Sequence, residues 1–155
     1  MAVVPDSEVV FHLDDPEPAR QALSEAMETV GAWVNVLPLL DPGEEPPPRN
    51  LFVAIFSSRG PELPLITISR AGNDAGTVSL GLQHPGGQKA LDRLAADGLA
   101  LPPGWLKIAD HPRRGLVVNA PLAAAVDGLD WLIEAALRLT ERSLPTRWAA
   151  RIYRP

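Results

Sequence analysis

Residues 65–82 read LITISRAGNDAGTVSLGL, and this stretch has the pattern of two strands joined by a turn. In the second half Val78, Leu80 and Leu82 alternate with small residues, and residues 65–69 alternate in the same way. A period of two is typical of a half-buried strand, and the glycines, Asn and Asp between the halves favour a turn. We therefore expect an antiparallel hairpin here.

Other segments predict further strands. Residues 51–56 read LFVAIF, a continuous apolar run that we expect to join the hairpin as the first strand of a meander. Residues 105–109 and 116–119 flank a loop with a proline and a glycine, which indicates a second hairpin. An extended piece at 8–13 is a possible additional strand.

Three segments predict helices. Apolar residues recur at steps of three and four from Ala19 to Val34, after acidic residues and Pro16, which favour a helix start with a capping carboxylate. A short helix is expected at 88–96, with Gly98 as its stop, and a long one from Pro121 to about residue 141. The predicted class is α+β, an antiparallel β-sheet with helices in the order α-β-β-β-α-β-β-α.

The last predicted helix has more apolar surface than a single sheet covers. Its polar residues form one stripe, so the apolar residues on two other sides need a second cover. Either the tail at 142–155, folded back as a helical turn, or a second subunit supplies that cover. We expect the tail indole to be buried and the tail arginines to approach the acidic amino-terminal third. The candidate interface residues are Trp131, Leu132, Ala135, Leu139 and Trp148.

Length and composition limit the class of protein. A chain of 155 residues is typical of one domain, in which the proline-rich stretch at about 41–49 is an exposed internal connection. The absence of cysteine excludes disulfides, thiolate metal sites and a cysteine nucleophile. Neither a secretory signal nor an apolar run long enough to span a bilayer occurs, so we expect a cytoplasmic protein without a membrane partner.

The charge pattern bears on the partner. The net charge is −5, which argues against nucleic acid, because phosphate binding depends on clustered Lys and Arg. Acidic residues dominate up to residue 48, whereas arginines dominate after Pro112, including those of the basic tail at 142–155. The two ends are expected to lie near each other and screen one another.

One loop contains residue types that are common in catalytic and anion-binding sites. Asp110 and His111 are a candidate general-base pair, and Arg113 and Arg114 are candidate ligands for an anionic substrate. Neighbouring residues in a strand point to opposite sides, however, so an ordinary turn with solvated arginines explains the same residues. We assign no catalytic residue beyond these candidates.

Two further patterns are weaker. His84 and the glycines that follow it precede a helix, and backbone N–H groups at such a start bind anions, but a turn has the same composition. His12 with Asp14 and Asp15 lacks the further ligands that a metal site needs. We therefore expect neither a metal nor a cofactor.

The predicted order of elements, from residue 16 to residue 141, resembles that of the type III secretion chaperone superfamily and its relatives outside secretion systems. The resemblance rests on element order, acidic charge and a long helix that is apolar on two sides. It implies a small homodimer without cofactor that binds extended segments of other proteins. The strand at 8–13, the proline-rich connection and the arginine-bearing tail depart from that pattern.

We expect a non-enzymatic module that binds another protein or a peptide and forms a homodimer. The alternative is an enzyme or a small anionic-ligand binder that uses the loop from Asp110 to Arg114. A pocket with several convergent polar groups would distinguish the two.

Overall fold

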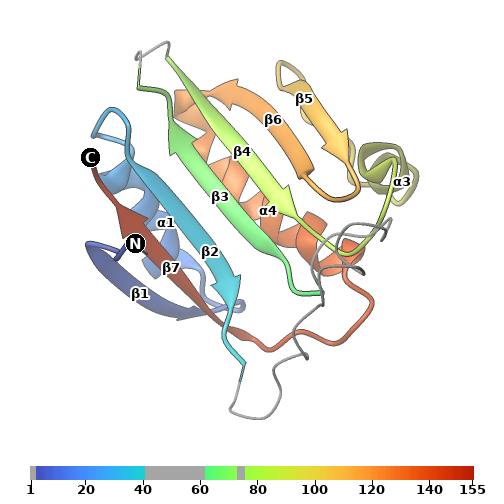
Figure 1. The fold of residues 1–155 in the computed structure, drawn as a ribbon, viewed down its shortest axis with the longest axis horizontal. Coiled ribbons are helices and arrows are strands. Elements are labelled where there is room, and N and C mark those ends of the chain that lie inside the picture. The colour runs from blue at the N-terminus through green and yellow to red at the C-terminus, as the bar shows by residue number, and fades with distance from the viewer. Residues whose placement is uncertain (1–2, 41–61, 73–75) are drawn as a thin grey trace.

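The computed structural model describes residues 3–40, 62–72 and 76–155. In this part of the chain, seven strands form one antiparallel sheet in the order β1-β7-β2-β3-β4-β6-β5 (Figure 1). The strands are β1 (Ser7–His12), β2 (Trp33–Pro38), β3 (Leu65–Arg70), β4 (Thr77–Gln83), β5 (Leu106–His111), β6 (Gly115–Pro121) and β7 (Arg147–Tyr153). The helices are α1 (Glu17–Ala26), α3 (Ala90–Ala96) and α4 (Ala125–Leu139), with a 3₁₀ turn at Leu122–Ala124. The predicted α+β class with an antiparallel sheet is confirmed.

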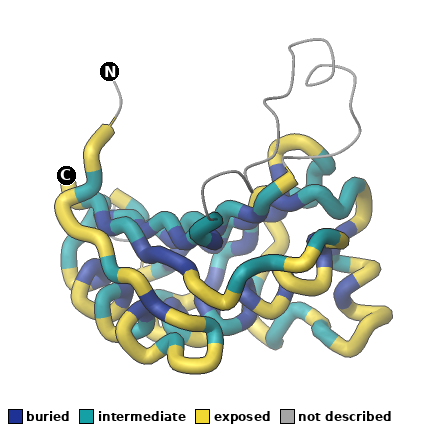
Figure 2. The backbone as a smooth tube through the Cα atoms, turned by 90° about the horizontal axis from the view of Figure 1, so that it is seen from below, coloured by how far each residue is buried: buried dark blue, intermediate teal, exposed yellow. Residues whose placement is uncertain are grey.

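One face of the sheet carries the helices. Both α1 and α4 pack behind the strands, and α3 packs against α4 near β5 (Figure 1). Buried and half-buried residues alternate along the central strands, so the buried set faces the helices (Figure 2). None of the described helices covers the opposite face, which we call the open face. No described helix is both long enough and apolar enough to cross a bilayer.

The expected hairpins form. Strands β3 and β4 pair with Ile68 opposite Leu80, both fully buried. Strands β5 and β6 pair around the turn before Gly115, with an irregularity between Lys107 and Ala109. The expected strand at 51–56 and the proline-rich connection at 41–49 lie outside the described residues. The observed order of elements differs from the predicted one, because β1 precedes the first helix, β2 follows that helix directly and β7 ends the chain.

The first helix is shorter than predicted. Helix α1 ends at Ala26, and the backbone turns at Gly31, where φ is +83°. Val34 lies in β2, where it alternates with Val36 as a core residue rather than continuing the helix. The start is also simpler than expected, because Pro16 precedes α1 without any side-chain capping hydrogen bond.

The tail is a strand, not a helical turn. Strand β7 lies between β1 and β2 and hydrogen-bonds to both. The prediction that Trp148 is buried is confirmed: its exposed fraction is 0% and its Nε1 donates to the Pro145 carbonyl at 2.9 Å. The tail also approaches the acidic amino-terminal end as predicted, because Arg151 Nε lies 2.7 Å from Glu8 Oε2.

Candidate functional site

The expected pair Asp110 and His111 lies at the end of β5, but the two side chains have separate partners. The Asp110 carboxylate accepts hydrogen bonds from the backbone N–H groups of Ala90 (3.2 Å) and Leu91 (3.0 Å) at the start of α3. These N–H groups have no carbonyl acceptor within the helix, so a carboxylate there acts as a cap. Asp110 caps α3 from a neighbouring strand, and the described residues show no hydrogen bond between Asp110 and His111.

His111 stabilises the turn that follows it. Its Nδ1 accepts hydrogen bonds from the backbone N–H groups of Arg113 (3.1 Å) and Arg114 (3.2 Å). Both arginine side chains are exposed, and Arg114 borders a hollow of about 220 Å³ on the open face. Asp110 thus makes no hydrogen bond that would orient His111 among the described residues, and a catalytic or anion-binding role for this loop stays a prediction.

A cleft of about 590 Å³ lies beside this loop, between the start of α3 and β5. Two lysines, Lys89 and Lys107, line it together with Asp92 and Asp110, so its charges are mixed. Lys89 is the only described residue other than glycine with a positive φ, at 56°. None of the buried polar atoms that lack a hydrogen-bond partner in the described chain belongs to its lining.

His84 is a core residue. Its side chain is fully buried, and Nδ1 accepts a hydrogen bond from the Gly86 N–H at 3.0 Å, which places the ring proton on Nε2. Desolvation by burial lowers the pKa of His84 below 6.5; the Asp110 carboxylate opposes this shift, and Arg93 adds to it. The anion site expected at the start of α3 already holds the Asp110 carboxylate.

The five predicted interface residues belong to the core of one chain. Trp131, Leu132, Ala135, Leu139 and Trp148 are all buried without a second subunit. Their second cover is partly the segment after α3, because Trp131 Nε1 donates to the Ala100 carbonyl at 3.2 Å and its ring meets Trp105 edge-on at 6.1 Å. These side chains are thus already removed from water within one chain, and an interface that uses them stays a prediction.

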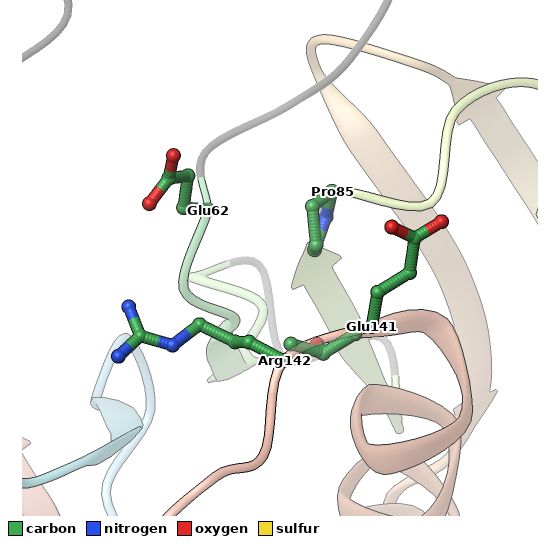
Figure 3. A pocket seen from close by; sticks show the side chains of 5 residues that line it. Glu62, Pro85, Glu141 and Arg142 are labelled. Atoms are coloured by element: carbon green, nitrogen blue, oxygen red, sulfur yellow. The ribbon is translucent and has the colours of Figure 1, made fainter. Parts of the chain in front are cut away.

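A cavity that the sequence did not indicate lies where β4 and α4 end. It measures about 350 Å³ and is lined by Glu62, Pro85, Thr140, Glu141 and Arg142 (Figure 3). Thr140 is 7% exposed, and its Oγ1 is buried without a hydrogen-bond partner in the described chain. Burial of this threonine was not visible in the sequence, because Thr140 is an ordinary polar residue at the end of a helix pattern.

The outer edge of β5 is the second feature that sequence reasoning missed. Among the described strands β5 is the last in the sheet, and Leu106 and Ile108 are 64% and 57% exposed. Edge strands present unpaired N–H and C=O groups that another strand can meet. Exposed apolar residues on such an edge give it both hydrogen-bonding and apolar contact surface.

The described residues form an α+β fold in which helices cover one face of an antiparallel sheet. No group of three or more His, Cys, Asp or Glu side chains in the described ranges is placed to hold a metal ion. Comparison of the chain with protein-family models, with curated proteins and with solved structures finds no match.

Proposed function

We propose that this protein is a non-enzymatic module that binds an extended segment of another protein by adding it as a strand to the edge of β5. The observation that carries the proposal is the exposure of Leu106 and Ile108 on that edge, at 64% and 57%. In strand addition, main-chain hydrogen bonds supply affinity and the side chains beside the edge supply specificity.

The hydrogen bonds made by Asp110 and His111 favour a binding role over an enzymatic one. Both oxygens of the Asp110 carboxylate accept backbone N–H groups of α3, and His111 Nδ1 accepts two N–H groups of its own turn. Side chains so engaged hold the β5–β6 hairpin and α3 in place. The loop thus works as support for the β5 edge.

Two features restrict what pairs with this edge. Lys107 places a charge in the middle of the strand, and the irregularity between Lys107 and Ala109 interrupts a regular ladder. Both are devices by which edge strands avoid indiscriminate pairing. We therefore expect a short partner segment with an acidic residue opposite Lys107.

A second copy of the chain meets that requirement. If two β5 strands pair antiparallel about an axis between Ile108 and Ala109, Lys107 of each copy faces Asp110 of the other. Both residues lie on the helix side of β5, opposite Val118 and Leu116 in β6. The homodimer that we propose therefore uses β5, and not the last helix.

Solution mass and a defined peptide test the proposal. Light scattering of the full chain at tens of micromolar is expected to give a dimer, and a fluorescent peptide of residues 104–112 is expected to compete with dimerisation. Leu106→Glu and Ile108→Glu are expected to shift the protein to monomer and weaken peptide binding at least about tenfold, which corresponds to about 1.4 kcal/mol.

Val10→Glu is the matched control, because Val10 is a 44% exposed apolar residue on the other edge strand, β1. It should leave mass and peptide affinity unchanged. A monomeric wild type that does not bind the peptide would contradict the proposal, and so would equal loss of binding in the Val10 variant.

A further inference from the structure

The two lysines of the chain line one cleft, the one of about 590 Å³ between the start of α3 and β5. Lys89 and Lys107 are the only lysines among the 14 Lys and Arg residues, so arginine is otherwise the cation of this sequence. Neither ammonium group has a hydrogen bond or an ion pair within the described chain. Two unpaired positive charges that meet in one cleft favour an anionic ligand there.

Lys89 has a backbone conformation that is costly for any residue with a Cβ. Its φ of 56° and ψ of 44° lie in the left-handed region, which glycine adopts freely. Strained residues of this kind cluster at ligand sites, where the surrounding structure holds them in place. A glycine would avoid the strain, so the folding of this turn does not account for the lysine side chain.

His111 adds a third donor to the cleft from the end of β5. Its Nδ1 accepts the backbone N–H groups of Arg113 and Arg114, so the neutral ring carries its proton on Nε2. Asp110 also lines the cleft, but both of its oxygens accept backbone N–H groups of α3. Two ammonium groups and one imidazole N–H are therefore the donors that a ligand can meet.

We propose that this cleft binds the phosphate group of a small phosphorylated sugar. A phosphate monoester carries a charge of about −1.5 to −2 at neutral pH and three strong acceptor oxygens. Its charge complements Lys89 and Lys107, and its three oxygens match the three side-chain donors. A carboxylate has one charge and two coplanar oxygens, a geometry that a guanidinium fits better than two separate ammonium groups do.

The rest of the cleft suits the sugar. Its volume lies within the usual range of about 300–1,000 Å³ for small-molecule sites, which leaves room for the organic part of the ester. Gln88 and Asp92 line it, and neither side chain has a hydrogen bond within the described ranges. The Asp92 carboxylate repels phosphate but accepts hydrogen bonds from hydroxyl groups. Leu91 and Pro112 provide apolar contact for the C–H groups of the sugar.

The site shares Lys107 with the homodimer proposed above but does not rest on it, because Lys89 and His111 take no part in that pairing. Calorimetry measures ligand binding directly, whereas light scattering measures mass. Either proposal can therefore fail while the other stands.

Binding is measured by calorimetric titration of the full chain with D-glucose 6-phosphate. Three compounds serve as matched controls: D-glucose lacks the phosphate, D-glucuronate carries a carboxylate in its place, and inorganic phosphate lacks the sugar. D-Glucose 6-phosphate is expected to bind at least about tenfold more tightly than each control, and more weakly as salt is added. Absence of saturable binding at millimolar concentration would overturn the proposal, and so would equal affinity for D-glucuronate or inorganic phosphate.

Two variants separate binding from folding. Lys89→Gly is expected to weaken binding at least about tenfold but to keep or raise the Tm, because glycine adopts this φ without strain. Lys107→Gln, at an exposed position, should weaken binding to a similar extent. Arg114→Gln is the control, because it removes a cation of the same hairpin that lines the hollow on the open face instead. Wild-type affinity in both lysine variants, or an equal loss in Arg114→Gln, would refute the assignment.

Discussion

The two edges of the sheet are built differently. At one edge, β1 is paired to β7, α1 packs against both strands, and Phe11 is buried at 2% exposure. At the other edge, β5 is attached through its hairpin with β6, and Asp110 links it to α3. Polar contacts add to the first edge: Arg151 pairs with Glu8 at 2.7 Å, and the Asp6 carboxylate accepts the Arg154 N–H at 2.6 Å.

The β1 edge contributes more to the core of the fold than the β5 edge does. The β1 edge is made from the two ends of the chain, which lie side by side in Figure 1, and its side chains contribute to the core. The β5 edge comes from a local hairpin whose outward apolar side chains contribute nothing to the core. A surface that carries exposed Leu106 and Ile108 without a folding role is the better candidate for binding.

The largest effect is expected from removing β7. A chain ending at Leu144 loses an interior strand and the buried residues Trp148 and Ile152. Loss of one large core side chain costs about 3–5 kcal/mol, and the whole stability of a domain is about 5–15 kcal/mol. We expect this chain to show no cooperative unfolding transition in circular dichroism.

Removal of residues 1–12 is the comparison for that truncation. It deletes β1, an edge strand, and leaves β7 paired with β2. We expect a lower Tm but a cooperative transition. If both truncations unfold the protein, the β1 edge is as essential as the strand inside it, and the distinction between them fails.

A smaller effect is expected at the β5 edge from Gly115→Ala. Gly115 begins β6 with φ +88°, and an added Cβ would lie within 3.0 Å of the Leu82 carbonyl group in β4. Strain in the left-handed region costs about 1–2 kcal/mol, and the clash with backbone adds to it. We expect the Tm to fall by on the order of ten degrees, since about 2–4 °C accompanies each kcal/mol at this size.

Gly104→Ala measures the cost of backbone strain without a steric clash. Gly104 has φ +86°, but nothing lies within 4 Å of its added Cβ, so only the strain remains. Its Tm is expected to fall by a few degrees in the same thermal melts. Equal losses at Gly104 and Gly115 would show that the close approach of the hairpin to β4 does not hold the β5 edge.

The sequence predicted correctly those elements whose apolar periodicity fits only a strand or only a helix. The hairpin of β3 and β4 and the long helix α4 follow from clear periods of two and of three to four. Two errors share a cause, because a spacing of four residues satisfies both periods. Val30 and Val34 fit a helix, as do Trp148 and Ile152, yet Val34 and the tail pair lie in strands. The signal that distinguishes them is the residue midway between each pair, Ala32 and Ala150, which is also buried.

The candidate sites were less predictable because they depend on long-range contacts. Asp110 and the start of α3 are about twenty residues apart, and only the fold shows that one caps the other. The cavity brings together Glu62, Pro85 and Thr140 from three separate segments. The exposure of Leu106 likewise depends on strand order, which no local pattern encodes.

The smallest effect on stability is expected from a moderate fall in pH, which acts through His84 on the β5 side of the molecule. His84 is buried with its neutral ring held by the Gly86 N–H, and burial lowers its pKa below 6.5. The unfolded chain binds the proton at the ordinary pKa, so it takes up more protons than the folded chain once the pH falls below about 6.5. The stability is therefore fully present above that pH and decreases as the pH falls toward the folded-state pKa, below which this contribution is constant.

Urea unfolding at a series of pH values measures this decrease. His84→Asn removes the titration but keeps an acceptor for the Gly86 N–H, so its stability should change less between pH 7 and pH 5 than that of the wild type. His12→Asn is the control for the substitution itself, at an exposed position on the β1 edge. Asp110 on β5 and Arg93 on α3 act on His84 with opposite signs, so Arg93→Gln should reduce the acid sensitivity by removing the positive charge that opposes protonation. A wild-type slope in His84→Asn would assign the acid sensitivity to other groups.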